Sequence, residues 1–171
     1  MRWYSHKICT GAIVFAGTMN IWLTILAVAT STFPDRIEEV IHGKMPKNLQ
    51  RPPEYHRKAS HWIGFYLPVL IISFYGAQQF PLATLEDWLG AVATINTYSC
   101  LALLFNILLW LTVGAVLHIA EDFPCGKMSV RSPFKKDNLP RLFYTGSTAE
   151  LGVDVLIAGV CLLYCLHWMS S

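Results

Sequence analysis

The sequence is poor in charged residues, which make up only 14% of its 171 positions. Hydrophobic residues account for 54%, and this balance excludes an ordinary soluble domain and indicates a small integral membrane protein. The chain also lacks internal repeats and low-complexity tracts, so we expect one domain over residues 1–171. Its five cysteines form no C-x-x-C pair, and the four in apolar segments are interpreted as packing residues. Cys125, in a polar stretch, is left unassigned.

Four apolar segments alternate with polar connections; they cover residues 8–33, 62–80, 89–119 and 151–169. A spanning helix needs about 20 apolar residues, so each of the last three segments predicts a transmembrane helix. The first segment follows Arg2 and Lys7, as the core of a signal peptide would. It is longer than such a core, and no small-x-small cleavage motif follows it, so we expect it to be retained. The fold class that follows is all-α and polytopic.

Lys and Arg are missing from residues 81–88 and from the C-terminus. All thirteen lie in the stretches 2–7, 36–58 and 127–141, and basic residues favour the cytoplasmic side of a membrane. A straight first helix would put two of the thirteen across the membrane from the other eleven, whereas a turn at Gly17-Thr18-Met19-Asn20 would put all of them on one side. We therefore predict three spanning helices plus an N-terminal helical hairpin, with a straight fourth span as the alternative.

Histidine and aspartate residues stand at the ends of these apolar segments. Imidazoles and carboxylates are the usual ligands of zinc and similar ions, and ionisable groups at membrane depth commonly mark a functional site. A hairpin would bring His6 and Asp35 together, whereas a straight helix would separate them by about 43 Å. The predicted metal ligands are His6, Asp35, His56, His61, His118 and Asp122.

Four blocks of sequence carry a resemblance to a known family: Tyr4–Gly11, Phe33–Asp35, His56–His61, and His118–Asp122 with Pro124 and Gly126 after it. Their order resembles that of the bacterial inner-membrane metal-dependent hydrolases of the YdjM type, with H-x-x-x-x-G, L-P-D-x-D, H-R-G-x-T-H and H-x-x-x-D-x-x-T-x-x-G. The resemblance covers residues 6–134. The chain departs from it where Ile37, followed by Glu38, replaces a second Asp and where Lys58 replaces a Gly.

The resemblance implies a multi-pass protein of the bacterial inner membrane, distantly similar to zinc-dependent phospholipases C and all-helical single-strand nucleases. Asp35, His56 or His61, His118 and Asp122 would hold one ion. His6 would bind a second, with Asp122 as the bridge. Two close ions activate water and stabilise a leaving oxygen in phosphoester cleavage. We expect Zn²⁺, with Mn²⁺ as the alternative and with one or two ions bound.

Two further residues are candidates for catalysis. Arg57 lies between two predicted ligands, so we expect its guanidinium to bind a scissile phosphate. Glu150 is either a late ligand or general base, or a helix N-terminal acid in a capping pattern that begins at Ser147. The remaining cations of the 36–58 loop are explained by topology or by attraction to anionic lipid.

The sequence thus predicts hydrolysis of a phosphoester in a lipid or lipid-linked substrate at the cytoplasmic face. Membrane lipid is the expected partner, and nucleic acid is not expected. Two alternatives belong to other classes. One is a non-enzymatic membrane subunit with a structural metal site, and the other is a haem-binding membrane subunit that uses His118 and His167.

Overall fold

The computed structural model describes residues 3–43, 57, 59–126, 128–139, 141–145 and 147–171. Most of these residues are helical, as predicted. The α-helices are α1 (Trp3–Thr18), α2 (Ile21–Thr30), α3 (Phe33–His42), α4 (Ile63–Gln79), α5 (Leu85–Ala93), α6 (Thr97–Asp122) and α7 (Thr148–Ser170), with the short 3₁₀ helices η1 (Ala59–His61) and η2 (Phe123–Cys125). One antiparallel pair, β1 (Met128–Ser132) and β2 (Lys135–Asp137), was not predicted, because these strands are short and their turn lacks an Asn-Gly type signal.

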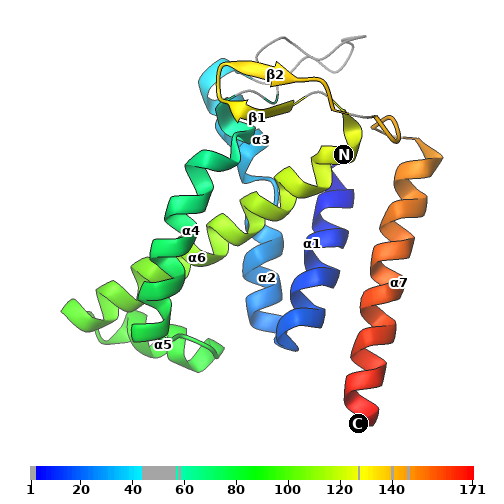
Figure 1. Ribbon diagram of the computed structural model, residues 1–171. Helices are drawn as coiled ribbons and strands as arrows, with labels where there is room; N and C mark the ends of the chain where they lie inside the picture. The colour runs from blue at the N-terminus through cyan, green and yellow to red at the C-terminus, as the bar shows by residue number, and fades with distance from the viewer. Residues whose placement is uncertain (1–2, 44–56, 58, 127, 140, 146) are drawn as a thin grey trace.

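The first apolar segment is broken into α1 and α2, which run antiparallel and side by side (Figure 1). Met19 adopts a left-handed backbone with φ of 50°. The side-chain oxygen of Asn20 then accepts hydrogen bonds from the backbone N–H groups of Trp22 and Leu23, at 3.0 and 3.1 Å. Such a cap satisfies donors that would otherwise be left open at a helix start. The predicted break at residues 17–20 is confirmed.

The third apolar segment was interpreted as one continuous span over residues 89–119, and this is wrong. The chain leaves α5 after Ala93 and begins α6 at Thr97. Asn96 caps α6, because its side chain accepts from the backbone N–H of Ser99 at 2.9 Å while the Ser99 hydroxyl accepts from Asn96 N at 2.9 Å. This reciprocal cap starts a new helix within an apolar stretch.

Two helices of the described chain are long and apolar enough to cross a membrane. They are α6, counted with η2 as Thr97–Cys125, and α7, and only 28% and 17% of their most apolar windows are buried. A core helix of a soluble protein would be mostly buried, so this exposure favours a lipid environment. α4, with 17 residues and an internal Pro68, is shorter. The predicted number of three spans stays a prediction.

The elements place the described Lys and Arg residues at one end of the molecule. The N-terminal ends of α1 and α7, helix α3, the C-terminal end of α6 and the β-hairpin gather there (Figure 1). The turn between α1 and α2, helix α5 and the chain's C-terminus lie at the other end. Every described Lys and Arg belongs to a segment of the first end. This arrangement fits the one-sided charge distribution that the hairpin prediction required.

A close approach of α2 to α6 positions this end. A Cβ atom added at Gly114 would collide with the Thr30 hydroxyl and would lie 2.9 Å from the carbonyl oxygen of Ala27. The Thr30 hydroxyl itself donates to the Trp110 carbonyl at 2.8 Å. Only glycine therefore allows this contact, which fixes where α3 begins relative to the end of α6.

We predict that Gly114→Ala destabilises the protein by about 1–3 kcal/mol, because the added methyl group overpacks the contact between α2 and α6. Thermal unfolding in detergent measures the change. Gly159→Ala is the matched control in α7, where no described heavy atom lies within 4 Å of the added carbon. Equal melting temperatures for the two variants would contradict the close-packing interpretation.

Candidate metal centre

Five of the six predicted ligands meet at the cationic end of the molecule. They form two overlapping groups whose ligand atoms lie within 4.8 Å of one another: His6, His118 and Asp122, and Asp35, His61 and His118. The four elements α1, α3, η1 and α6 contribute to these groups. The sixth predicted ligand, His56, lies outside the described residues.

Local structure explains how these side chains come to face each other. His118 and Asp122 are four residues apart near the end of α6, so they share one helix face. Asp35 lies in the first turn of α3, where Trp3 Nε1 donates to its Oδ2 at 3.0 Å. The Tyr66 hydroxyl donates to the Ser60 carbonyl at 2.7 Å, which ties η1 to α4 and holds the neighbouring His61 in place.

The spacing of one set of donor atoms matches the shell of a single ion. His61 Nε2 lies 3.2 Å from His118 Nε2 and 3.4 Å from Asp35 Oδ1, and the latter two atoms are 3.6 Å apart. Asp122 Oδ2 completes the set at 3.5 Å from His61 Nε2 and 3.8 Å from His118 Nε2. Ligands about 2.0–2.1 Å from a tetrahedral zinc ion stand roughly 3.3 Å from one another. Three of these donors, on His61, His118 and Asp35, are therefore close enough together to hold one divalent ion, and Asp122 Oδ2 lies beside two of them.

His6 lies beside this set and extends it. Its Nε2 is 3.5 Å from Asp122 Oδ1, and its ring stacks on that of His118 with centroids 3.8 Å apart. The two oxygens of Asp122 thus face different partners, Oδ2 toward the four-donor set and Oδ1 toward His6. A carboxylate in this position can bridge two ions, as the resemblance to the hydrolase family implied.

The electrostatics of the centre favour a cation. The side chains of His6, His61 and His118 are fully buried, and buried charges need partners. Burial alone would lower the pKa of His61, but hydrogen bonds to the carboxylates of Asp122, Asp35 and Glu38 raise it to about 10. Burial acts to raise the pKa of Asp35, yet the imidazoles of His118 and His61, whose Nε2 atoms lie 3.6 and 3.4 Å from its Oδ1, hold this pKa well below its usual range. The carboxylates therefore stabilise positive charge at this point, whether it is a proton or a metal ion.

Unsatisfied polar atoms support the same conclusion. His6 Nε2, Asp35 Oδ1 and His118 Nδ1 are buried and have no hydrogen-bond partner among the described residues. Two of these atoms belong to the proposed ligand shell. Buried polar atoms nearly always have a hydrogen-bond partner, so several unpartnered atoms in a single cluster indicate a site that binds an ion. The residues present fit a divalent metal.

Two glutamates hold the imidazoles in position, and the sequence analysis did not assign them this role. Glu121 Oε2 lies 2.6 Å from His6 Nδ1, and the Thr10 hydroxyl donates to Glu121 Oε1 at 3.0 Å. Glu38 Oε1 lies 3.2 Å from His61 Nδ1. In both pairs Nε2 is left to face the centre, an orientation typical of metal-binding histidines. For Glu38 the sequence offered one indication, because this acid stands one place after the position of the family's second Asp. For Glu121 it offered none, because Glu121 is 115 positions from His6.

We predict that Glu121→Ala weakens metal binding by about 10- to 100-fold, as the loss of a carboxylate behind a ligating histidine usually does. Glu121→Gln should lose less, because an amide oxygen still accepts from His6. Competition with a fluorescent chelator measures the affinity. Glu39→Ala, which removes a partner of Arg36 on the surface of α3, is the control. An unchanged affinity in Glu121→Ala would remove Glu121 from the support of the centre.

Arg57 reaches the centre, as predicted. Its Nη2 donates to Asp122 Oδ1 at 2.8 Å, and its backbone N–H donates to Glu38 Oε1 at 2.8 Å. Its Nε is buried and has no hydrogen-bond partner among the described residues. The guanidinium therefore holds one carboxylate and keeps a further donor for another acceptor.

Glu150 and His167 are not part of either candidate ligand group. Glu150 is buried in the first turn of α7, where its backbone N–H donates to the Ser147 hydroxyl at 3.3 Å. This contact fits a cap formed by Ser147, and the role of the Glu150 carboxylate stays a prediction. Further along α7, Asp154 Oδ1 accepts from Cys9 Sγ at 3.3 Å. His167 lies near the C-terminus at the opposite end of α7, far from the end of α6 that carries His118 (Figure 1). A haem-binding pair of these two histidines is not brought together.

Comparisons of the chain with protein-family models, with curated proteins and with solved structures find no match. The basis for a functional inference is therefore the centre itself: its donor atoms, its charge and its place at the end of an apolar helix.

Proposed function

We propose that the chain is a membrane-bound, metal-dependent hydrolase that cleaves a phosphoester of a lipid or lipid-linked substrate at the cytoplasmic face. The observation that carries this proposal is a guanidinium beside a ligand cluster. Arg57 binds Asp122 through Nη2 and has a buried Nε without a partner among the described residues. Arginine pairs readily with phosphate oxygens because its planar fork presents parallel donors.

Asp35, His61, His118 and Asp122 are the proposed ligands of one ion, and His6 with Asp122 of a second. The mixed nitrogen and oxygen donors suit Zn²⁺ best, with Mn²⁺ as the alternative. A divalent ion in this position supplies an activated water and stabilises charge on phosphoryl oxygens. The protein's own contribution is to orient these donors, since Glu38 and Glu121 hold two of the three imidazoles.

Arg57 is the residue that we assign to the substrate. Its Nε–H, which has no partner among the described residues, would donate to a phosphoryl oxygen throughout the reaction. Because the surrounding side chains are buried, this interaction gains strength from the exclusion of water. The order of His6, Asp35, Arg57, His61, His118 and Asp122 in the chain, which resembles the YdjM-type hydrolases, supports the same assignment.

The position of the centre supports a lipid substrate. His118 and Asp122 lie at the end of α6, a helix apolar enough to span a membrane, so the centre would stand at the membrane surface. A lipid headgroup occupies that depth without leaving the bilayer. In this proposal α4, α6 and α7 cross the bacterial inner membrane, and α1 and α2 enter it from the cytoplasmic side as a hairpin.

We predict that cysteines introduced at positions 3, 40 and 135 are labelled from the same side of the membrane, because the hairpin returns the chain to the side where it started. Position 95, between α5 and α6, should be labelled from the opposite side. A membrane-impermeant maleimide applied to intact cells and to inverted vesicles measures this as a gain over the parent chain. Labelling of position 3 together with position 95 would contradict the hairpin topology.

The direct test of the function is a hydrolysis screen. The purified chain in nanodiscs is assayed against phospholipids, lipid-linked phosphates and a chromogenic phosphodiester, with its metal content determined in parallel. We expect hydrolysis that a chelator abolishes and that added Zn²⁺ or Mn²⁺ restores. A chain that retains its metal and hydrolyses none of these esters would refute the proposal.

The complete burial of three imidazoles favours one other function, a non-enzymatic membrane subunit with a structural metal. A structural zinc site is closed by four protein ligands, whereas a catalytic site keeps one position open. Visible absorption of the cobalt-substituted protein separates the two, because an open site changes its spectrum when a small anion such as azide is added. An unchanged spectrum would favour the structural role.

A further inference from the structure

The β-hairpin stands next to the metal centre and is firmly attached to it. The backbone N–H of Ser129 donates to the carbonyl of Arg57 at 3.1 Å, and Trp62 Nε1 donates to the carbonyl of Val130 at 3.1 Å. Met128 packs among Tyr66 and Ile119 in a small buried cluster. The hairpin is therefore held on the protein by its first strand, and its second strand and turn are left to face outward.

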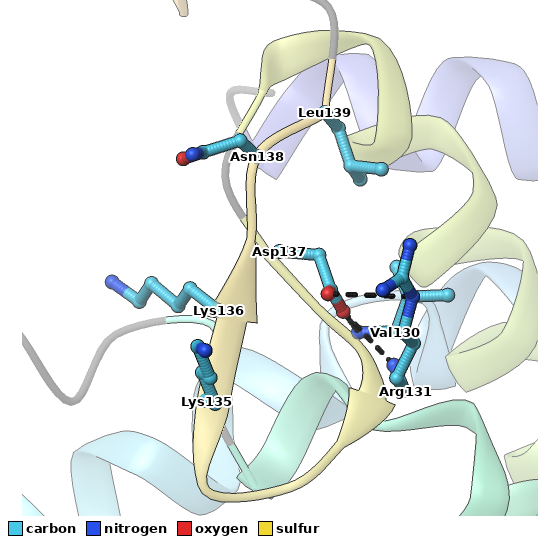
Figure 2. A pocket seen from close by; sticks show the side chains of 7 residues that line it. All are labelled: Val130, Arg131, Lys135, Lys136, Asp137, Asn138 and Leu139. Carbon is cyan, nitrogen blue, oxygen red and sulfur yellow. Dashed lines mark hydrogen bonds and ion pairs between the residues drawn. The ribbon is translucent and has the colours of Figure 1, made fainter.

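A recess of about 410 Å³ is formed along this hairpin, which we name the hairpin recess. Its lining contains three cationic side chains and a single carboxylate; the lining residues are Val130, Arg131, Lys135, Lys136, Asp137, Asn138 and Leu139. Figure 2 shows Lys136 and Asn138 projecting from one side of β2, and Asp137 turned to the opposite side. The cations thus outnumber the acids in the lining.

Asp137 is already engaged by the hairpin itself. Its Oδ2 accepts from the backbone N–H groups of Val130 and Arg131 at 3.1 and 2.9 Å, and its Oδ1 lies 3.7 Å from Arg131 Nε. The backbone hydrogen bonds keep the pKa of Asp137 below its usual value. The Asp137 carboxylate is thus bound within the hairpin. The described lining of the recess keeps a net positive charge, which suits an anion.

The turn of the hairpin adds an apolar group to this charge. Phe134 is 84% exposed at the tip, directly before Lys135. In the segment that follows, Leu142 and Tyr144 are also exposed. An exposed aromatic ring beside lysines is unfavourable in water but suits the interface of a membrane, where apolar and charged groups meet.

Connectivity places the hairpin at that interface. It lies between the end of α6 and the start of α7, the two helices that can span a membrane, and at the end of the molecule where the described cations lie. We propose that the hairpin recess binds the phosphate of an anionic phospholipid headgroup, with Phe134 inserted among the neighbouring lipids. This site is separate from the metal centre and does not require hydrolysis.

The test compares lipid binding by the full-length chain and its variants. Native mass spectrometry measures the apparent affinity for phosphatidylglycerol and for zwitterionic phosphatidylcholine. A basic residue at a membrane surface contributes about a fivefold gain in affinity for anionic lipid. We expect Lys135→Gln to lower the affinity for phosphatidylglycerol by roughly fivefold and to leave that for phosphatidylcholine unchanged. Lys135 is exposed, so the fold should persist.

Two controls make the result decisive. Lys7→Gln removes an exposed lysine of α1 at the same end of the molecule but outside the hairpin recess, and it should have little effect. An equal loss in this variant would show general charge attraction and overturn the proposal. Inorganic phosphate is the second probe. If it displaces phosphatidylglycerol at millimolar concentration and binds equally well without lipid, the ligand is a free phosphate and the lipid assignment is wrong.

Discussion

Replacement of His118 by alanine is expected to remove nearly all bound metal from the purified protein. His118 belongs to both candidate ligand groups, and its Nε2 lies 3.2 Å from that of His61. Its loss would take one donor from the first ion and would remove the ring against which His6 stacks. Each ligand of a metal site contributes to an apparent binding free energy of about 10–16 kcal/mol in structural zinc sites, so removing one lowers occupancy steeply. Elemental analysis after gel filtration measures the metal-to-protein ratio.

His118 is buried, so a variant closer in shape keeps this test informative. Asp122→Asn preserves the size of the side chain and removes the charge of a carboxylate whose Oδ1 faces His6 and whose Oδ2 faces His61 and His118. We expect it to lose metal as well, while circular dichroism shows an unchanged helix content. His167→Ala, at the far end of α7, should retain the parent's metal content. Full metal occupancy in both His118→Ala and Asp122→Asn would disprove the centre.

Arg57→Ala is expected to lower turnover by about 10²-fold or more, in line with the loss of one preorganised donor to a developing negative charge. The metal content should stay near that of the parent. Arg57 touches Asp122 but carries a positive charge, so its removal takes no ligand from the ion. Steady-state hydrolysis of the phosphoester identified in the screen, with metal analysis of the same sample, measures both quantities.

Arg57→Lys separates charge from geometry. Lysine keeps the positive charge but lacks the fork that can hold Asp122 and a phosphate at once, so turnover should recover only in part. Lys7→Ala, an exposed cation away from the centre, should change activity little, and only at low salt because exposed charges are screened. Similar, small and salt-sensitive losses of activity in Arg57→Ala and Lys7→Ala would show that both cations act only by general electrostatic attraction.

The sequence alone determined the features that depend on local pattern and composition. Long apolar segments with few charges predict membrane helices, and the placement of Lys and Arg favoured a turn near Asn20, where the structure breaks the first segment. Asn20 acts within its own turn of helix, through bonds to the next few residues. The same is true of His118 and Asp122, whose spacing of four residues already places them on one face.

The break before α6 shows where local reasoning failed. The apolar stretch over residues 89–119 has the hydropathy of a single span, yet Asn96 and Ser99 cap a new helix inside it. The β-hairpin was missed for a related reason, since its strands carry too few residues to produce a clear alternation. A short polar cap or turn outweighs hydropathy locally because it satisfies backbone groups directly.

Only the tertiary structure decided which groups support the ligands. Glu121 meets His6 across 115 positions of sequence, and Arg57 meets Asp122 across 65. Neither pair has a spacing that a helix or strand would reveal. Candidate metal ligands can be recognised from sequence because the ability to bind a metal is a property of a single side chain. The residues that support those ligands cannot, because they depend on how distant helices pack.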